Sequence, residues 1–131
     1  MQEINVYVKG VVYQNKGKGF ALSAWAVKGE PVHYIEHENE SAYGAERESV
    51  INAILNLRNI SSWLHFYSNQ KALMGQGNNH TLPTIHPIVQ ARCDFTWYPL
   101  KESPADLLRL REMAMQEVEK RGKAREKEVV W

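Results

Sequence analysis

Two acidic residues stand near expected helix starts, on the sides of those helices that should face a sheet. Glu46 shares a helical stripe with the apolar residues Val50 and Ala53, so its carboxylate points toward the expected core. Asp106 lies in the first turn of a second expected helix, on the same side as Leu110. A buried carboxylate is costly unless it is paired or bound to a cation. These acids are therefore metal ligands, members of ion pairs, or first-turn acids that reach solvent and favour the helix dipole.

The spacing of apolar residues changes along the chain from the period of strands to the period of helices, and it predicts the elements that would position these acids. Strands are expected at 4–13, 20–27, 32–37, 63–67 and 94–98, and helices at 45–57, 70–74, 82–91 and 103–128, although Pro87 disfavours the third helix. An antiparallel meander followed by strands that return through helices favours an α/β fold. We expect one domain over residues 1–131, with a five-stranded mixed sheet and helices on both faces.

Local signals indicate where two of the helices begin. Ser41 precedes the first long helix at a distance suited to a side-chain cap. Ser103 followed by Pro104 predicts the start of the last helix, with serine as the cap and proline at the first helical position. Glu117 and Arg121 are spaced to form a pair on the surface of that helix.

Composition restricts the class of protein. The chain has 131 residues, 44% of them hydrophobic and 24% charged, with a formal net charge of +1, as in an ordinary globular domain without a general attraction for polyanions. Cys93 is the single cysteine, which fits a reducing compartment and a small packed side chain better than a nucleophile. No apolar run approaches about 18 residues. We therefore expect a cytoplasmic protein with no membrane partner.

Charge is distributed unevenly near the start of the chain. Residues 4–29 carry four lysines and no acidic residue, and two of these lysines lie in the turn formed by residues 15–19, NKGKG. The glycines of such a turn let backbone N–H groups approach phosphates, and the lysines add positive charge. The alternative is a plain hairpin turn with solvated lysines.

Four short segments follow one another in an order that resembles type 1 ribonuclease H. They are YVKGV at 7–11 with NKGKG at 15–19, AER at 45–47, YSNQ at 67–70 and ADLL at 105–108. The family carries Tyr-Thr-Asp-Gly-Ser with Asn-Pro-Gly-x-Gly, Ala/Met-Glu-Leu, Thr-Asp-Ser-Gln and Ala-Asp-x-Leu-Ala at the corresponding places. The resemblance covers residues 4–116 and rests on the order and spacing of the motifs together. It implies a ribonuclease H-like fold.

The family cleaves the RNA strand of RNA·DNA hybrids with four carboxylates that hold two divalent cations. The resemblance places Lys9, Glu46, Ser68 and Asp106 at those four positions, so two acids remain and two are replaced. An ammonium is no metal ligand at neutral pH, and a hydroxyl is a poor ligand for a hard cation. We expect Lys9 to converge with Glu46 and Asp106 where the metals would sit. The basic, histidine-bearing loop of many family members looks absent, because residues 97–106 run almost directly from strand to helix.

The resemblance also implies a nucleic-acid contact. Asn15 and the main chain of its turn match the family turn that touches the hybrid, with Lys16 and Lys18 adding charge. Gln70 matches a family glutamine that contacts bases in the minor groove.

Two functions follow as expectations. The first is a pseudoenzyme, non-catalytic or weakly active, that binds an RNA·DNA hybrid or other nucleic acid weakly, or contacts a protein partner through its long last helix. This function requires no cofactor. The alternative is an active ribonuclease H-type endonuclease with a rearranged site, in which Glu46 and Asp106 hold Mg²⁺ or Mn²⁺.

Overall fold

The computed structural model describes residues 2–15, 18–57, 62–74 and 92–128. The strands are β1 (Gln2–Asn15), β2 (Lys18–Val27), β3 (His33–His37), β4 (Ser62–Ser68) and β5 (Arg92–Trp97). The α-helices are α1 (Ala42–Leu57) and α3 (Ala105–Glu128), and the short 3₁₀ helices are η1 (Lys71–Met74) and η3 (Leu100–Glu102). The helix expected at 82–91 lies outside the described residues.

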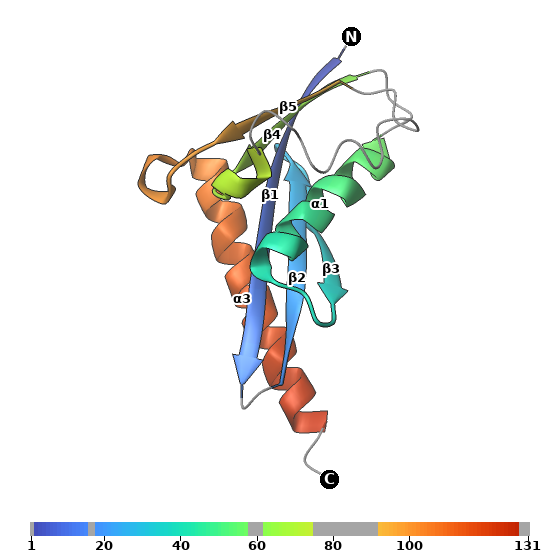
Figure 1. Ribbon diagram of the computed structural model, residues 1–131, viewed down its shortest axis with the longest axis vertical. Helices are drawn as coiled ribbons and strands as arrows, with labels where there is room; N and C mark the ends of the chain where they lie inside the picture. Colours follow the sequence, from blue (N-terminus) through green and yellow to red (C-terminus); the bar gives the residue numbers. More distant parts are fainter. Residues whose placement is uncertain (1, 16–17, 58–61, 75–91, 129–131) are drawn as a thin grey trace.

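The five strands form one mixed sheet in the order β3-β2-β1-β4-β5. Strand β2 pairs antiparallel with both β1 and β3, whereas β4 pairs parallel with both β1 and β5. The prediction of a three-strand meander joined to two parallel strands is therefore confirmed. Strands β1 and β2 are much longer than their neighbours and extend beyond the rest of the sheet as a hairpin (Figure 1).

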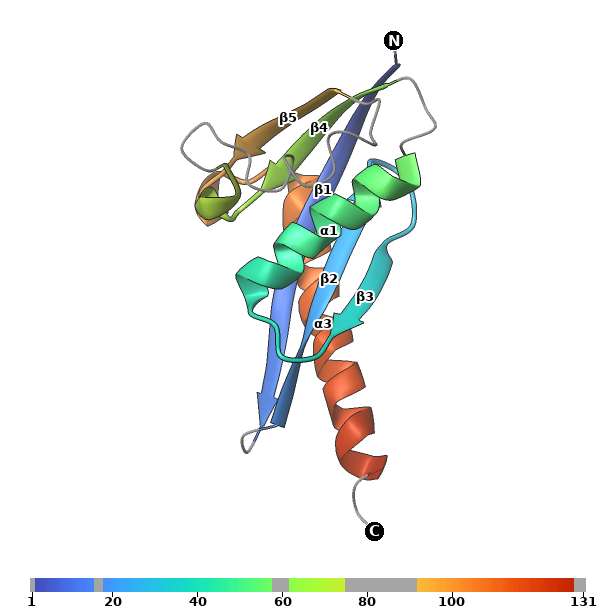
Figure 2. The same ribbon diagram turned by 45° about the vertical axis from the view of Figure 1, so that its right-hand side comes forward.

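The two α-helices cover opposite faces of this sheet. Helix α1 passes in front of β1 and β2, and α3 passes behind them (Figures 1 and 2). Side chains alternate between the two faces along β1, because successive strand residues point to opposite sides. Val6 and Val8 belong to the core cluster beneath α1, whereas Tyr7 and Val11 belong to the cluster beneath α3.

Helix α1 begins as its sequence signals predict. The hydroxyl of Ser41 accepts a hydrogen bond of 2.9 Å from the N–H of Gly44, which caps the first turn. Val50, Ala53 and Ile54 are fully buried on one side of the helix, and burying each of the two larger side chains contributes roughly 1.5–3 kcal/mol. The helix begins at Ala42, slightly earlier than expected.

The predicted start of α3 is wrong in its cap. Helix α3 begins at Ala105, and the carbonyl of Pro104 accepts its first hydrogen bonds. The hydroxyl of Ser103 is used elsewhere: it donates to the carbonyl of Pro99 at 3.0 Å and accepts from the amide of Asn69 at 2.6 Å. Serine therefore joins the end of β4 to the start of α3 instead of capping the helix.

The inner side of α3 packs along β1 and β2. Four of its side chains are buried there: Leu107, Leu110, Ala114 and Val118. The predicted pair of Glu117 with Arg121 is present at 2.7 Å. Because the apolar stripe is occupied within the chain, a protein partner on this helix would meet the outer side, where Leu108 and Met115 are exposed. None of the described helices is both long and apolar enough to cross a membrane.

Candidate functional site

Helix α1 and strand β1 approach each other closely at Gly10. A Cβ atom on this glycine would lie 2.1 Å from the carbonyl oxygen of Ala42 and 2.4 Å from the nitrogen of Glu46. Only a residue without a side chain permits this contact between helix and strand backbones. The approach brings the side chain of Glu46 onto the backbone of β1.

The carboxylate of Glu46 is fully buried and surrounded by donors from β1 and from the end of β4. Its Oε1 accepts the N–H of Gly10 at 2.9 Å and lies 3.9 Å from the Nζ of Lys9. Its Oε2 accepts the hydroxyl of Ser68. The backbone N–H of Gln70 donates to that hydroxyl at 2.8 Å and also lowers the pKa of the carboxylate. We call these five residues the Glu46 cluster.

Burial dominates the electrostatics of the Glu46 cluster. Loss of solvent raises the pKa of Glu46 above its ordinary value of 4.5, and Lys9, Ser68 and the two backbone N–H groups lower it again without cancelling the effect of burial. Groups of the chain itself therefore compensate the burial of this carboxylate in part. No water-exposed oxygen is left on Glu46 for an additional partner.

The start of α1 is also fixed from its other side. Ser23, buried on β2, donates its hydroxyl to the carbonyl of Ala45. The same hydroxyl lies 2.6 Å from the Nε2 of His37 on β3. Ser23 therefore joins α1 to β2 directly and to β3 through His37, one residue before Glu46. The position of the Glu46 carboxylate is fixed by this packing of the helix on the sheet.

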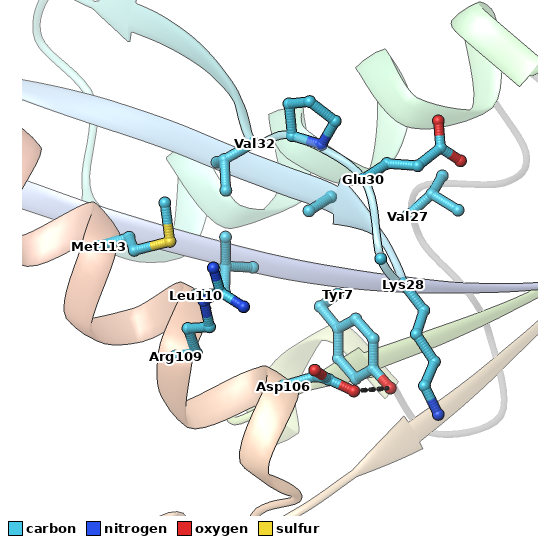
Figure 3. Close-up of a pocket in the computed structure, with 12 residues that line it drawn as sticks. Tyr7, Val27, Lys28, Glu30, Val32, Asp106, Arg109, Leu110 and Met113 are labelled. Carbon is cyan, nitrogen blue, oxygen red and sulfur yellow. Dashed lines mark hydrogen bonds between the residues drawn. The ribbon is translucent and has the colours of Figure 1, made fainter.

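Asp106 is held in a different place from the Glu46 cluster. It belongs to α3, on the opposite face of the sheet, and its Oδ2 accepts a hydrogen bond of 3.4 Å from the hydroxyl of Tyr7 (Figure 3). Among the described residues Lys9 forms its ion pair with Glu46 and none with Asp106. The structure thus brings together Lys9, Glu46 and Ser68 of the four motif positions, and gives Asp106 a separate partner.

Tyr7 is a residue that reasoning from the sequence did not single out. Burial, with help from the nearby charge of Asp106, raises its pKa to about 12. Its phenol therefore stays protonated at ordinary pH and remains a donor to Asp106. The available signal was its position two residues before Lys9 on β1, but strand spacing alone does not reveal which helix residue lies opposite.

A metal ion would need several acidic, histidine or cysteine side chains close together. Among the described residues no three of them come close enough together to hold a metal ion. The only acidic side chain within the Glu46 cluster is Glu46 itself, and a divalent cation there would meet the ammonium of Lys9. Cys93 is half-buried, and burial together with Asp94 raises its pKa to about 11, which disfavours a thiolate nucleophile.

The residues expected to contact nucleic acid are only partly placed. Lys16 and the side chains of Asn15 and Lys18 lie outside the described residues. Gln70 is described, follows Ser68 at the end of β4, and has a partly exposed side chain. Its backbone N–H, which donates to the hydroxyl of Ser68, makes it the member of the Glu46 cluster nearest to this surface.

An exposed aromatic residue near Gln70 was also missed. Trp97 ends β5 with 37% of its surface exposed, and its indole N–H donates to the carbonyl of Asn69 at 3.2 Å. The ammonium of Lys71 lies 5.1 Å from the centre of the Trp97 ring. An aromatic face and a lysine therefore lie beside the predicted base-contacting glutamine, at the end of the sheet where β4 and β5 finish.

The candidate functional site is the end of the sheet where β4 and β5 finish. It consists of a buried carboxylate paired with a lysine and a serine, with an exposed tryptophan and lysine next to it. No protein-family model matches the chain, and a search of curated proteins finds no match.

Proposed function

We propose that this chain is a ribonuclease H-like domain that binds nucleic acid without cleaving it. In this proposal the Glu46 cluster stands where the related enzymes hold their metal ions. The observation that carries the proposal is the contact of the Lys9 ammonium, at 3.9 Å, with a fully buried Glu46 whose other oxygen accepts the hydroxyl of Ser68.

The sheet supports the ribonuclease H-like part of the proposal. Three antiparallel strands continue into two parallel strands in the order β3-β2-β1-β4-β5, with α1 entering after the meander. The motif residues 7–11 lie on β1, and the motif 67–70 begins at the end of β4, which runs parallel beside β1 with Tyr67 paired to Tyr7. This pairing brings the first and third motifs to the same part of the sheet, where Lys9 and Ser68 both contact Glu46, and it supports the resemblance at these positions.

The absence of cleavage follows from charge. Two-metal hydrolysis needs several carboxylates facing a pair of divalent cations, which activate water and stabilise the leaving oxygen. Here a cation of the protein already lies against Glu46, and Asp106 is bonded to Tyr7. An ammonium in that position repels Mg²⁺, and losing the metals costs many orders of magnitude in rate.

Binding without cleavage is supported by the surface next to the cluster. Trp97 can stack on a base, and base stacking on an aromatic side chain contributes roughly 1–3 kcal/mol. Lys71 beside it and Gln70 on the adjoining segment can meet phosphate and base edges. With a net charge of only +1, affinity depends on these local groups and is expected in the micromolar range or weaker, as for non-specific association.

Binding is tested by titrating a labelled RNA·DNA hybrid, duplex DNA and single-stranded RNA with the full chain at several salt concentrations, followed by fluorescence anisotropy. The double substitution Lys16→Ala with Lys18→Ala is expected to weaken binding and reduce the salt slope by roughly two, one unit per lost phosphate contact. Trp97→Ala is expected to weaken binding at every salt concentration. Lys123→Ala is the matched control, because this exposed lysine pairs with Glu119 on α3.

The outcomes separate the competing functions. No binding to any of these ligands at low salt would contradict the nucleic-acid proposal. The remaining function would then be an interaction with a protein partner. Cleavage of the hybrid in Mg²⁺ that disappears in Glu46→Gln would instead establish the active endonuclease.

A further inference from the structure

A cleft of about 330 Å³ opens on the α3 face of the sheet, away from the Glu46 cluster. Its walls come from the first turns of α3, from Tyr7 on β1, and from the turn that joins β2 to β3 (Figure 3). This volume is at the lower end of the range for small-molecule sites. A ligand that fills it is therefore much smaller than a dinucleotide cofactor.

The charged residues that line the cleft balance one another. They are two acids, Glu30 and Asp106, and two cations, Lys28 and Arg109. Such a lining favours neither a simple anion nor a simple cation. It is complementary to a ligand that carries one charge of each sign.

Asp106 and Arg109 lie one helical turn apart, so both side chains rise from the same side of α3 toward the cleft (Figure 3). They form no ion pair with each other among the described residues, where the bond of Asp106 is to the hydroxyl of Tyr7. That bond uses Oδ2 and leaves Oδ1 able to accept from a ligand. The phenol, with a pKa of about 12, keeps its proton and holds the carboxylate in place.

The rest of the cleft is apolar. Val32 faces the α3 side chains Leu110 and Met113 across it (Figure 3). Methionine adapts its shape easily to a neighbouring apolar group. A short aliphatic side chain therefore has a place next to the charged pair.

We propose that this cleft binds a small zwitterion of the α-amino acid class with an apolar side chain. The ligand ammonium contacts Asp106, the ligand carboxylate contacts Arg109, and the side chain lies between Val32 and Met113. Guanidinium groups are well suited to carboxylates because they form two parallel hydrogen bonds. This site is independent of the proposed nucleic-acid function and uses none of the residues of the Glu46 cluster.

The test is a titration of the full ¹⁵N-labelled chain with L-leucine, followed by two-dimensional NMR. Saturable shifts are expected at the amides of Tyr7, of residues 28–32 and of residues 106–113. N-acetyl-L-leucine, which lacks the ammonium, and L-leucinamide, which lacks the carboxylate, are expected to bind about tenfold more weakly or worse, as charge-assisted hydrogen bonds are lost.

Three variants assign the contacts. Arg109→Met is expected to weaken leucine binding at least about tenfold while leaving leucinamide binding unchanged, and Asp106→Asn is expected to weaken leucine while leaving N-acetyl-L-leucine unchanged. Arg111→Met is the matched control, since Arg111 lies on the same helix outside the cleft lining. An unchanged amide spectrum away from the cleft checks that each variant is folded.

Three results would overturn the proposal: no saturable shift with L-leucine at tens of millimolar, equal binding of leucine and both blocked analogues, or the same loss in Arg111→Met as in Arg109→Met. Because Arg109→Met should leave hybrid binding unchanged, failure of this site and failure of the nucleic-acid function are distinguishable.

Discussion

The Nζ of Lys9 lies 3.9 Å from Oε1 of Glu46, a carboxylate with no exposed surface. A strand lysine and a helix glutamate thus form a pair inside the domain, and the absence of a side chain at Gly10 makes the approach possible. The side chain of Lys9 remains 17% exposed, so its ammonium keeps some contact with water while it compensates the buried charge.

Replacing the lysine tests what this pair contributes to stability. Lys9→Met keeps the length of the side chain but leaves Glu46 with only its hydrogen bonds from Ser68 and the backbone. We expect the unfolding free energy to fall by about 1–3 kcal/mol, the usual cost of an incompletely satisfied buried polar group. Urea denaturation measures the change. Lys28→Met, at an exposed position, is the control, and equal losses in both variants would contradict the assigned pair.

The raised pKa of Glu46 predicts a pH dependence of stability. The folded state binds this proton more tightly than the unfolded chain does, so stability is higher near pH 4.5 and falls as the pH rises through the folded pKa. Glu46→Gln removes the titrating group. The unfolding free energy of the wild type minus that of Glu46→Gln should therefore decrease with rising pH above 4.5. A difference that is flat or increases would show that Glu46 is not buried in this way.

Much of the fold could be predicted because its signals are local. The shift from period two to period 3.6 locates the strands and α1, and Ser41 caps α1 as expected. The position of Glu46 on the apolar side of α1 also follows from helical spacing, and the side chain is fully buried.

The contacts of Asp106 and Ser103 could not be predicted, because they depend on tertiary geometry. The partner of Asp106 is set by how α3 crosses β1, which no local pattern encodes. Similarly, Ser103 is a good cap by type, but Asn69 and Pro99 compete for its hydroxyl once the chain is folded. In the sequence Trp97 looks like an ordinary strand residue. Its exposure and its contact with Lys71 depend on how the end of the sheet is arranged in the folded chain.

The approach of α1 to β1 predicts that Gly10 is intolerant of substitution. The added methyl of Gly10→Ala would overlap backbone atoms of Ala42 and Glu46, which cannot move as a flexible side chain does. We expect a loss of about 3 kcal/mol or more, at the upper end for overpacking. Gly29→Ala is the comparison: its positive φ of 83° with open space around it should cost only about 1–2 kcal/mol. Chemical denaturation ranks the two, and the reverse order would contradict the close approach.

Glu36 on β3 forms ion pairs with two arginines in the second half of α3. It pairs with Arg121 at 3.0 Å and with Arg125, and the hydrogen bond from Arg125 is the main cause of its lowered pKa. Glu36→Gln should cost about 0.5–1 kcal/mol, since the groups are partly exposed, and less at high salt.

The sign of this pH effect is opposite to that of Glu46. Glu36 contributes stability above pH 4.5, and the contribution is lost as the pH falls through its folded pKa. Glu119→Gln, in an exposed pair with Lys123, is the control and should change stability little. Equal losses of stability in the two variants at every pH and salt concentration would contradict a stabilising role for the ion pairs of Glu36 with α3.

The central claim is that the Glu46 cluster has its own cation in place of a metal ion, and Mn²⁺ binding tests it most directly. Isothermal titration of the wild type with Mn²⁺ should detect no site that depends on Glu46. The double variant Lys9→Asp with Ser68→Asp, which removes the ammonium and adds two carboxylates beside Glu46, should gain a measurable site, because hard cations prefer anionic oxygen ligands. Specific binding of Mn²⁺ by the wild type that is lost in Glu46→Gln would contradict the account.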